Sequence, residues 1–231
     1  MIGSRNLKSY DNSSFGRPSF AYRIFKEYCK GKVINIGSGN GWFESRCKLD
    51  GIGEIFSTDI VFENLQLIKY LTIPCELINS RAEALPIKTG SIDTIFFSEV
   101  LEHVDINTEI QVLMSLNRIL SNGGYLVLTT PNNFVLSNLL DPAYFFGHRH
   151  YKIDEVISLL ESCNFEIVYS QIQGGVFAIL DDLLMYFFKW FFRIEPHPIK
   201  IVTRLANQEF YKPDKKLRRI HTLFIVAIKK N

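Results

Sequence analysis

The stretch "INIGSGNGW", residues 34–42, places three glycines at alternate positions directly after a run of β-branched and apolar residues. That run indicates a buried strand, and the segment that follows it, 42–50, has the spacing of a helix. Glycines between a strand and a helix let the backbone approach a ligand without obstruction by side chains. Glycines at such a junction can also simply form the turn, so the loop alone leaves both interpretations open.

Apolar runs and helix-period segments alternate along the chain, which favours a parallel sheet with helices on both faces. We expect strands at 32–37, 54–60, 74–79, 93–99, 125–130, 165–172 and 220–230. Helices are expected at 18–29, 42–50, 62–71, 109–120 and 153–162. Because no repeat or low-complexity tract interrupts this pattern, we expect residues 1–231 to form a single domain.

The composition indicates an ordered, globular chain, with 231 residues of which 47% are hydrophobic and 22% charged. A net charge of +2 lacks the basic bias that a long nucleic-acid footprint would need. The 4 cysteines form no C-x-x-C pair, so neither a zinc knuckle nor a redox motif is indicated. The first thirty residues contain no apolar signal-peptide core, and we therefore expect a reduced, cytoplasmic protein.

The glycine spacing differs from that of a dinucleotide-binding loop, which would need its third glycine where the chain has Trp42. Asp59 ends the second expected strand, and there its carboxylate could accept hydrogen bonds from both hydroxyls of a ribose. Taken alone, Asp59 could be an ordinary turn or cap residue. The loop and the acid together indicate a nucleoside site.

Four ordered sequence blocks carry a family resemblance. "VINIGSGNG" (33–41) resembles V-L-D-I-G-x-G-x-G, and "RAEALPIKTGSIDTIFFSEVLEHV" (81–104) resembles D-A-E-x-L-P-F-x-D-x-S-F-D-x-V followed by V-L-E-H-V. "LNRILSNGGYLVLTTPN" (116–132) is similar to L-x-R-V-L-K-P-G-G-x-L-x-x-x-x-P-N. Over about residues 30–172 the chain thus resembles the class I S-adenosylmethionine (SAM)-dependent methyltransferases, in the branch of small-molecule and ubiquinone-biosynthesis O-methyltransferases.

The resemblance implies an α/β fold, a Rossmann-like, doubly wound sheet of seven strands in the order 3-2-1-4-5-7-6 with strand 7 antiparallel. It also implies SAM as cofactor and S-adenosylhomocysteine as product. The glycine loop would lie under the methionine part of SAM, and Asp59 would bind the ribose. Arg81 and Ala82 would flank the adenine, and Ser98 and Glu99 would border the methionine end. The implied cofactor residues are Gly37, Ser38, Gly39, Gly41, Asp59, Arg81, Ala82, Ser98 and Glu99.

Two positions depart from the family pattern. The first strand carries Asn35 in place of an acid, and Arg81 stands where an acid usually meets the adenine amino group. Asparagine still forms hydrogen bonds, whereas Arg81 removes an acceptor. A catalytically silent SAM-binding module of the same fold is therefore the alternative to an active enzyme.

Transfer of a methyl group to a hydroxyl needs alignment of donor and acceptor and a base, which directs attention to the histidines. We expect His103 and His150 to be catalytic, although His103 could instead pack under the cofactor and cap a helix. Glu99, Glu102 and His103 form an E-x-x-E-H arrangement that resembles the metal-binding motif of some O-methyltransferases, with His148 or His150 as a further ligand. Because V-L-E-H-V also occurs in metal-free relatives, we expect no metal.

Two further segments bear on the acceptor. "FFGHRHY" (145–151) alternates aromatic and basic residues, and could hold an anionic or sugar-like acceptor or pack as a solvated loop. An insertion at 173–219 contains an apolar helix within 179–194, with one face formed by Leu180, Leu184, Phe187, Phe188 and Phe191. Asp181, Asp182 and Lys189 interrupt this short stretch, which argues against a membrane span.

The insertion could form a lid over the substrate, a dimer contact or a membrane-surface element. "KPDKKLRR" (212–219) places five cations within eight residues, and these would favour anionic headgroups or form a solvated surface. We rank a lid or oligomer contact first and a peripheral membrane contact second. The expected function is SAM-dependent methyl transfer to a small-molecule or lipid-linked acceptor at oxygen; nucleic acid is the weaker expectation, since no N-P-P-Y motif is present.

Overall fold

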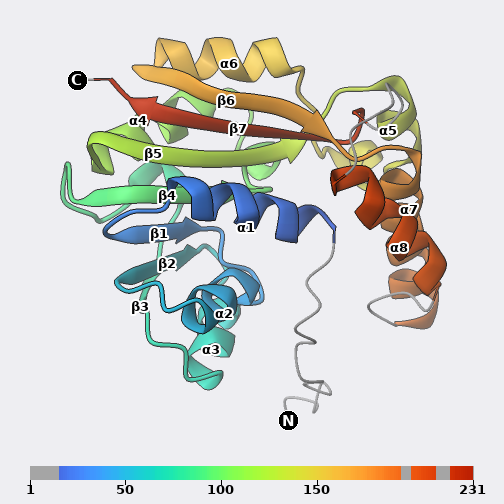
Figure 1. Ribbon diagram of the computed structural model, residues 1–231, viewed down its shortest axis with the longest axis horizontal. Coiled ribbons are helices and arrows are strands. Elements are labelled where there is room, and N and C mark those ends of the chain that lie inside the picture. Colours follow the sequence, from blue (N-terminus) through green and yellow to red (C-terminus); the bar gives the residue numbers. More distant parts are fainter. Residues whose placement is uncertain (1–15, 194–198, 212–218, 231) are drawn as a thin grey trace.

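The computed structural model describes residues 16–193, 199–211 and 219–230, and seven strands of this part form one sheet (Figure 1). The strands follow the order β3-β2-β1-β4-β5-β7-β6. Strands β1 to β5 pair in parallel, while β7 lies antiparallel between β5 and β6. Their bounds are β1 (Val33–Ile36), β2 (Ile55–Asp59), β3 (Glu76–Asn79), β4 (Ile92–Ser98), β5 (Leu120–Pro131), β6 (Phe165–Gln173) and β7 (Thr222–Lys229). The expected fold class and strand order are confirmed.

Helices cover both faces of the sheet because successive strand residues point to opposite sides. In β1, Ile34 and Ile36 join a core that also contains residues of α4 (Glu109–Ile119) and α6 (Ile153–Ser162). Val33, which precedes Ile34 and points to the other face, joins a second core with residues of α1 (Arg17–Tyr28) and α2 (Trp42–Leu49). The helix α3 (Phe62–Tyr70) leads from β2 to β3.

The connection between β5 and α6 contains structure that the sequence pattern did not predict. A short helix α5 (Val135–Leu140) is followed by a 3₁₀ segment η3 (Pro142–Phe146), and two further 3₁₀ turns, η1 (Ala82–Ala84) and η2 (Leu101–His103), follow β3 and β4. Strand β5 also begins earlier than expected, because Leu120 pairs with Ile92 before an irregularity in the register. Of these, α5 lies beside the carboxyl end of β5 (Figure 1).

The insertion forms two helices, α7 (Val176–Phe192) and α8 (Lys200–Tyr211), between β6 and β7. Figure 1 shows them as a pair beside one end of the sheet, extending away from it. The start of α7 is fixed by α8, since Glu209 Oε2 accepts hydrogen bonds from Gly175 N and Ala178 N, each at 3.0 Å. The basic run at 212–219 lies outside the described residues except for Arg219.

None of the helices in the described ranges combines the length and the apolar character that crossing a membrane requires.

Candidate functional site

The glycine loop serves both as a turn and as an opening. Gly37, Gly39 and Gly41 all have positive φ, at 79°, 52° and 78°. A Cβ on Gly37 would lie 2.5 Å from Val100 Cγ2, and one on Gly41 would lie 2.8 Å from Ile68 Cγ1. A Cβ on Gly39 would meet nothing within 4 Å. Packing thus requires two of the glycines, while the third faces open space.

Asp59 ties this loop to the next strand. Its Oδ2 accepts hydrogen bonds from Gly39 N at 2.8 Å and from Asn64 Nδ2 at 3.1 Å, and its Oδ1 accepts one from Val61 N at 2.8 Å. A carboxylate has about four lone-pair sites, so Asp59 can still accept a further donor. In the glycine loop, the residue before Gly39 is Ser38, whose Oγ is buried without a hydrogen-bond partner.

A cavity of about 120 Å³, which we call the loop cavity, lies at the carboxyl ends of β1 and β2. It brings together four of the expected cofactor residues, Gly37, Asp59, Arg81 and Ala82, with Ile36, Thr58, Ser80, Glu83, Val100 and His103 in the rest of its wall. An opening at Gly39, an unpartnered hydroxyl at Ser38 and an acceptor at Asp59 fit a nucleoside with a polar tail. The residues present therefore fit SAM.

Arg81 also pairs with two acids, one in the loop cavity wall and one outside it, and two further expected cofactor residues, Ser98 and Glu99, lie outside that cavity. Arg81 is half-exposed and its Nη2 lies 2.5 Å from Asp105 Oδ2 and 3.2 Å from Glu83 Oε1. Ser98 shares a hydrogen bond of 2.7 Å with Thr129 Oγ1. Glu99 lines a second cavity rather than the loop cavity.

The second cavity, which we call the histidine cavity, has a volume of about 130 Å³. Its polar wall comes from segments far apart in the chain: Arg17, Glu99, Glu102, His103, Ser137, Asp141, His148, His150, Asp182, Tyr186 and His221. Its apolar wall consists of Pro131, Leu140, Ile179 and Met185. His103 lines both cavities.

Three histidines and one carboxylate form a continuous chain in this cavity. His103 Nε2 lies 3.3 Å from His148 Nε2, and His148 Nδ1 lies 3.2 Å from Asp141 Oδ2. The same Oδ2 lies 2.9 Å from His150 Nε2, whose other ring nitrogen lies 2.7 Å from Asn138 Oδ1. His150 therefore has an oxygen partner at each nitrogen, whereas His103 has the other histidine as its ring partner.

The surroundings shift two pKa values in this chain. Burial lowers the pKa of His103, and neighbouring His148 lowers it further, so the ring is held neutral. Burial alone would raise the pKa of Asp141, but hydrogen bonds from His148, His150 and Ala143 N hold it well below its usual range. Because Asp141 is ionised, it accepts a hydrogen bond from Nδ1–H of His148. In the neutral ring, Nε2 then carries no proton and can act as an acceptor.

Ion pairs close the other side of the cavity. Arg17 Nη1 of α1 lies 2.9 Å from Glu99 Oε2 and 3.6 Å from Asp182 Oδ2 of α7. Asp182 Oδ2 in turn lies 3.0 Å from His221 Nε2. Glu102 of the same cavity wall is buried, and burial together with the charge of Glu99 raises its pKa well above the usual range.

Sequence patterns gave no signal for several of these residues. Arg17, Asp141 and His221 lie outside every motif, and Asp182 stood out only as an interruption of an apolar helix. Their role follows from where α1, η3, α7 and β7 meet. In "FFGHRHY", His148 and His150 face the cavity, while Phe145 is exposed and Arg149 donates to the carbonyls of Leu101 and Val104.

Two sets of donors could hold a divalent ion. Glu102, His103 and His148 form one set, and Asp141, His148 and His150 form the other, with ligand atoms within 4.8 Å of one another in each. The sets share His148, so they could not be complete for two ions at once. A hydrogen-bonded network and a metal site are therefore alternative uses of the same side chains.

Comparison with known proteins finds a family match over part of the chain. Residues 34–128 match the family described as a methyltransferase domain. An uncharacterised protein of Methanocaldococcus jannaschii is 29% identical over 189 residues, which are 81% of this chain and 72% of that protein.

Two solved structures show how far the fold extends. A SAM-dependent methyltransferase from Archaeoglobus fulgidus superposes with a TM-score of 0.66 at 20% identity, over 92% of this chain and 93% of that one. The [4+2]-cyclase SpnF superposes with a TM-score of 0.65 at 14% identity, over 92% of this chain and 80% of that one. Because the second protein is a cyclase, the fold by itself does not specify the reaction.

Proposed function

We propose that this chain, a class I SAM-dependent methyltransferase, transfers a methyl group from SAM to a hydroxyl oxygen of a small-molecule or lipid-linked acceptor. One observation carries the proposal: His103 lines both the loop cavity and the histidine cavity. If the donor occupies the first and the acceptor the second, a base stands where the acceptor loses its proton.

On the donor side, the glycine loop and Asp59 would bind the cofactor. The open side of Gly39 leaves room for the methionine part, Asp59 would accept from a ribose hydroxyl, and the amide of Ala82 would donate to the adenine ring. Glu99, which lines the histidine cavity, would face the methionine end. Bound SAM would supply an electrophilic methyl group on a sulfonium, and the sulfur would keep the electron pair of the broken C–S bond.

On the acceptor side, the histidine chain would take the proton. His103 is held neutral and can accept the hydroxyl proton as the O–C bond forms, while His148, oriented by Asp141, shares the resulting positive charge. His150 was expected to be catalytic, and we now propose a positioning role for it. With both ring nitrogens bonded, it would fix Asp141 rather than accept a proton from the substrate.

The lining of the histidine cavity favours an amphiphilic acceptor. Carboxylates and histidines line one part of the wall, and Leu140, Ile179 and Met185 line another. A hydroxyl-bearing head group with an apolar extension would satisfy both parts.

Cofactor binding tests the donor side. Calorimetric titration of the full chain with SAM and S-adenosylhomocysteine should give binding that Asp59→Ala weakens by about 10- to 100-fold, the expected loss of charge-assisted hydrogen bonds. Asn64→Ala is the matched control, because Asn64 touches the same carboxylate but does not line the loop cavity. Equal affinity of Asp59→Ala and the parent would contradict the ribose assignment.

Transfer of labelled methyl from SAM to a cell extract, followed by separation of water-soluble and lipid-soluble products, tests the reaction itself. We expect His103→Asn and His148→Asn to lower kcat by about 10²- to 10⁴-fold, while cofactor affinity is unchanged. His221→Gln, which changes a histidine elsewhere in the wall, is the control. Cofactor binding without transfer would favour a catalytically silent module. Loss of activity with a chelator, restored by Mg²⁺, would show that a bound metal rather than a histidine base activates the acceptor.

A further inference from the structure

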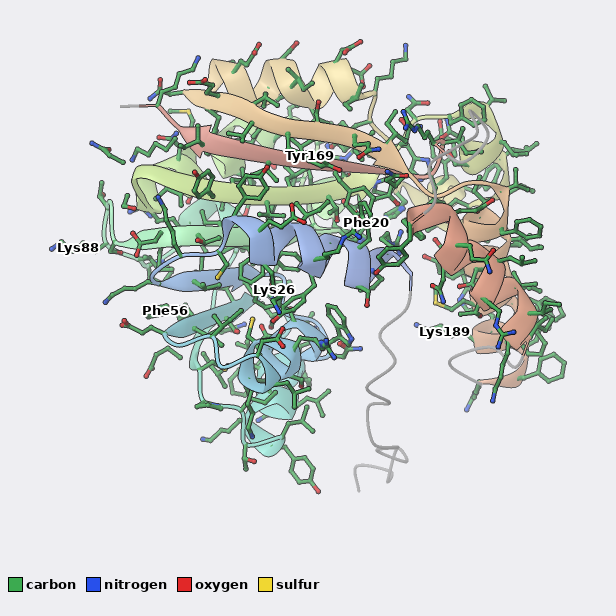
Figure 2. All side chains as sticks on the ribbon, in the orientation of Figure 1. Phe20, Lys26, Phe56, Lys88, Tyr169 and Lys189 are labelled. Carbon is green, nitrogen blue, oxygen red and sulfur yellow. The ribbon has the colours of Figure 1, made fainter. Side chains whose placement is uncertain are left out.

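The end of the insertion that points away from the sheet exposes large apolar side chains. In α7, Phe187, Trp190, Phe191 and Phe192 are exposed by 45%, 54%, 72% and 57%. At the start of α8, Ile199 and Ile201 are exposed by 37% and 68%. We call these six residues the aromatic tip; Figure 2 shows side chains extending from this end of the helix pair, where Lys189 is labelled.

The exposed rings cover about 200° of the helix end rather than forming a narrow stripe. Trp190, Phe191 and Phe192 are consecutive, and consecutive residues of an α-helix point about 100° apart. Phe187 adds contacts within this group, with ring centroids 5.0 Å from Phe191 and 5.9 Å from Phe192. A helix that docks on another protein buries one stripe, whereas a helix end with apolar groups over more than half of its circumference suits a medium that surrounds it.

Cations accompany the aromatic tip. Residues 183–208 contain four, Lys189, Arg193, Lys200 and Arg204, all of them exposed. The same stretch contains one carboxylate, Glu195, which lies outside the described residues. Aromatic rings combined with lysine and arginine suit the interface of a membrane, where the rings enter the headgroup region and the cations meet anionic lipids.

The helix that carries the tip also lines the histidine cavity. Ile179, Asp182, Met185 and Tyr186 contribute to the cavity wall, and Phe187 and Trp190 follow within the next turn or so. We propose that the aromatic tip inserts into the headgroup region of an anionic membrane and thereby holds the histidine cavity at the membrane surface. The membrane contact stands independently, and only its use for a lipid-linked acceptor rests on the proposed function.

Vesicle binding by the full chain tests the contact. We expect the chain to sediment with phosphatidylglycerol–phosphatidylcholine vesicles and far less with pure phosphatidylcholine. The double variant Trp190→Ser, Phe191→Ser should bind about 100-fold more weakly, at about tenfold for each buried side chain. The double variant Arg193→Glu, Lys200→Glu should lose at least about 25-fold, at about fivefold for each cation removed.

Two control variants carry matched changes elsewhere on the surface. Tyr70→Ser alters a ring of α3 that is 72% exposed, and Lys88→Glu reverses a cation at the opposite end of the sheet (Figure 2). Both should bind vesicles like the parent. Unchanged titration with S-adenosylhomocysteine shows that each variant is folded.

The proposal is overturned if the parent does not bind the anionic vesicles, or if the control variants lose as much binding as the tip variants. It is also overturned if light scattering shows a dimer that Trp190→Ser, Phe191→Ser dissociates, because a second copy of the chain would then cover the tip. Vesicle binding in the absence of any methyl transfer would leave this inference intact and contradict only the proposed function.

Discussion

Single residues show how the loop accommodates the unusual first strand. Asn35 stands where the resembled family has an acid, and its Nδ2 donates to Glu44 Oε1 of α2 at 2.8 Å. Ser57 Oγ of β2 donates to the same oxygen at 2.6 Å. A carboxyl group is therefore present beneath the loop after all, but α2 supplies it. The sequence showed only the departure at Asn35, because the pairing depends on how α2 packs across β1 and β2.

Glu44 gives a prediction about pH. Burial raises its pKa, although the hydrogen bonds from Ser57 and Asn35 lower it in part. Between the usual pKa of a glutamate and this raised value, the folded chain holds a proton that the unfolded chain has released, so stability falls as pH rises through that window. Glu44→Gln keeps an acceptor oxygen and stays neutral, and we expect its stability relative to the parent to improve between about pH 5 and about pH 8.

Urea unfolding at both pH values measures this change, and Glu44→Ala is the contrasting variant. Alanine leaves the donors of Asn35 and Ser57 without their acceptor, at about 1–3 kcal/mol for each, and should be less stable at both pH values. Glu102, whose pKa is also raised, is common to all three proteins, so their differences isolate Glu44. A Glu44→Gln variant whose relative stability does not change with pH would show that Glu44 is ionised in the fold.

At the scale of elements, α7 shows what a periodic pattern can predict. The sequence predicted a helix within 179–194 and grouped Phe187 and Phe191 on one face, and the structure has that helix as part of α7. Within the described chain this face is covered only in part, since Leu180, Leu184 and Phe188 are half-buried while Phe187 and Phe191 are exposed. Periodicity tells which side chains share a face, but how far a neighbouring element extends along that face depends on tertiary packing.

The same distinction explains which site residues could be predicted. Gly37, Asp59 and Ala82 sit in motifs at the ends of consecutive parallel strands, so their meeting at one cavity follows from the sheet order. Arg17 and Asp182 are more than 150 positions apart and meet only because α7 docks against the start of α1. No local pattern encodes that contact.

The contact between Arg17 and Asp182 gives a prediction about α7. Burial alone would raise the pKa of Asp182, but Arg17 and His221 lower it, so Asp182 stays ionised and ties α7 to α1 and β7. Asp182→Asn should destabilise this attachment by about 1–3 kcal/mol, since the pair is partly exposed. We expect faster hydrogen exchange in α7 and a higher KM for the acceptor, with unchanged affinity for S-adenosylhomocysteine.

Asp181→Asn is the control for that experiment, because it removes the same charge one position earlier and its carboxylate bonds Thr203 Oγ1 of α8 at 2.7 Å instead. Equal exchange rates in the two variants would contradict a specific attachment through Asp182.

At the scale of the whole molecule, the two ends of the insertion are held in the sheet. β6 precedes α7 and β7 follows α8, and β7 lies between β5 and β6. The histidine cavity takes its wall from Arg17 through His221, so the site requires α1, the ends of β4 and β5, α7 and the residue before β7 to come together. This arrangement supports the prediction that residues 1–231 fold as one domain, and cooperative unfolding is the way to test it.

The 2 tryptophans of the chain report from opposite parts of it, Trp42 at the glycine loop and Trp190 at the aromatic tip. Trp190→Phe and Trp42→Phe each leave a single fluorescent reporter. For one domain, both variants should unfold in a single transition, and S-adenosylhomocysteine at 100 times its Kd should stabilise both by about 2.7 kcal/mol. Ligand bound near Trp42 would then stabilise the region of Trp190 equally, because neither part unfolds alone. Earlier melting reported by Trp190, with no response to ligand, would instead make α7 and α8 a separate unit, and the single-domain prediction would be wrong.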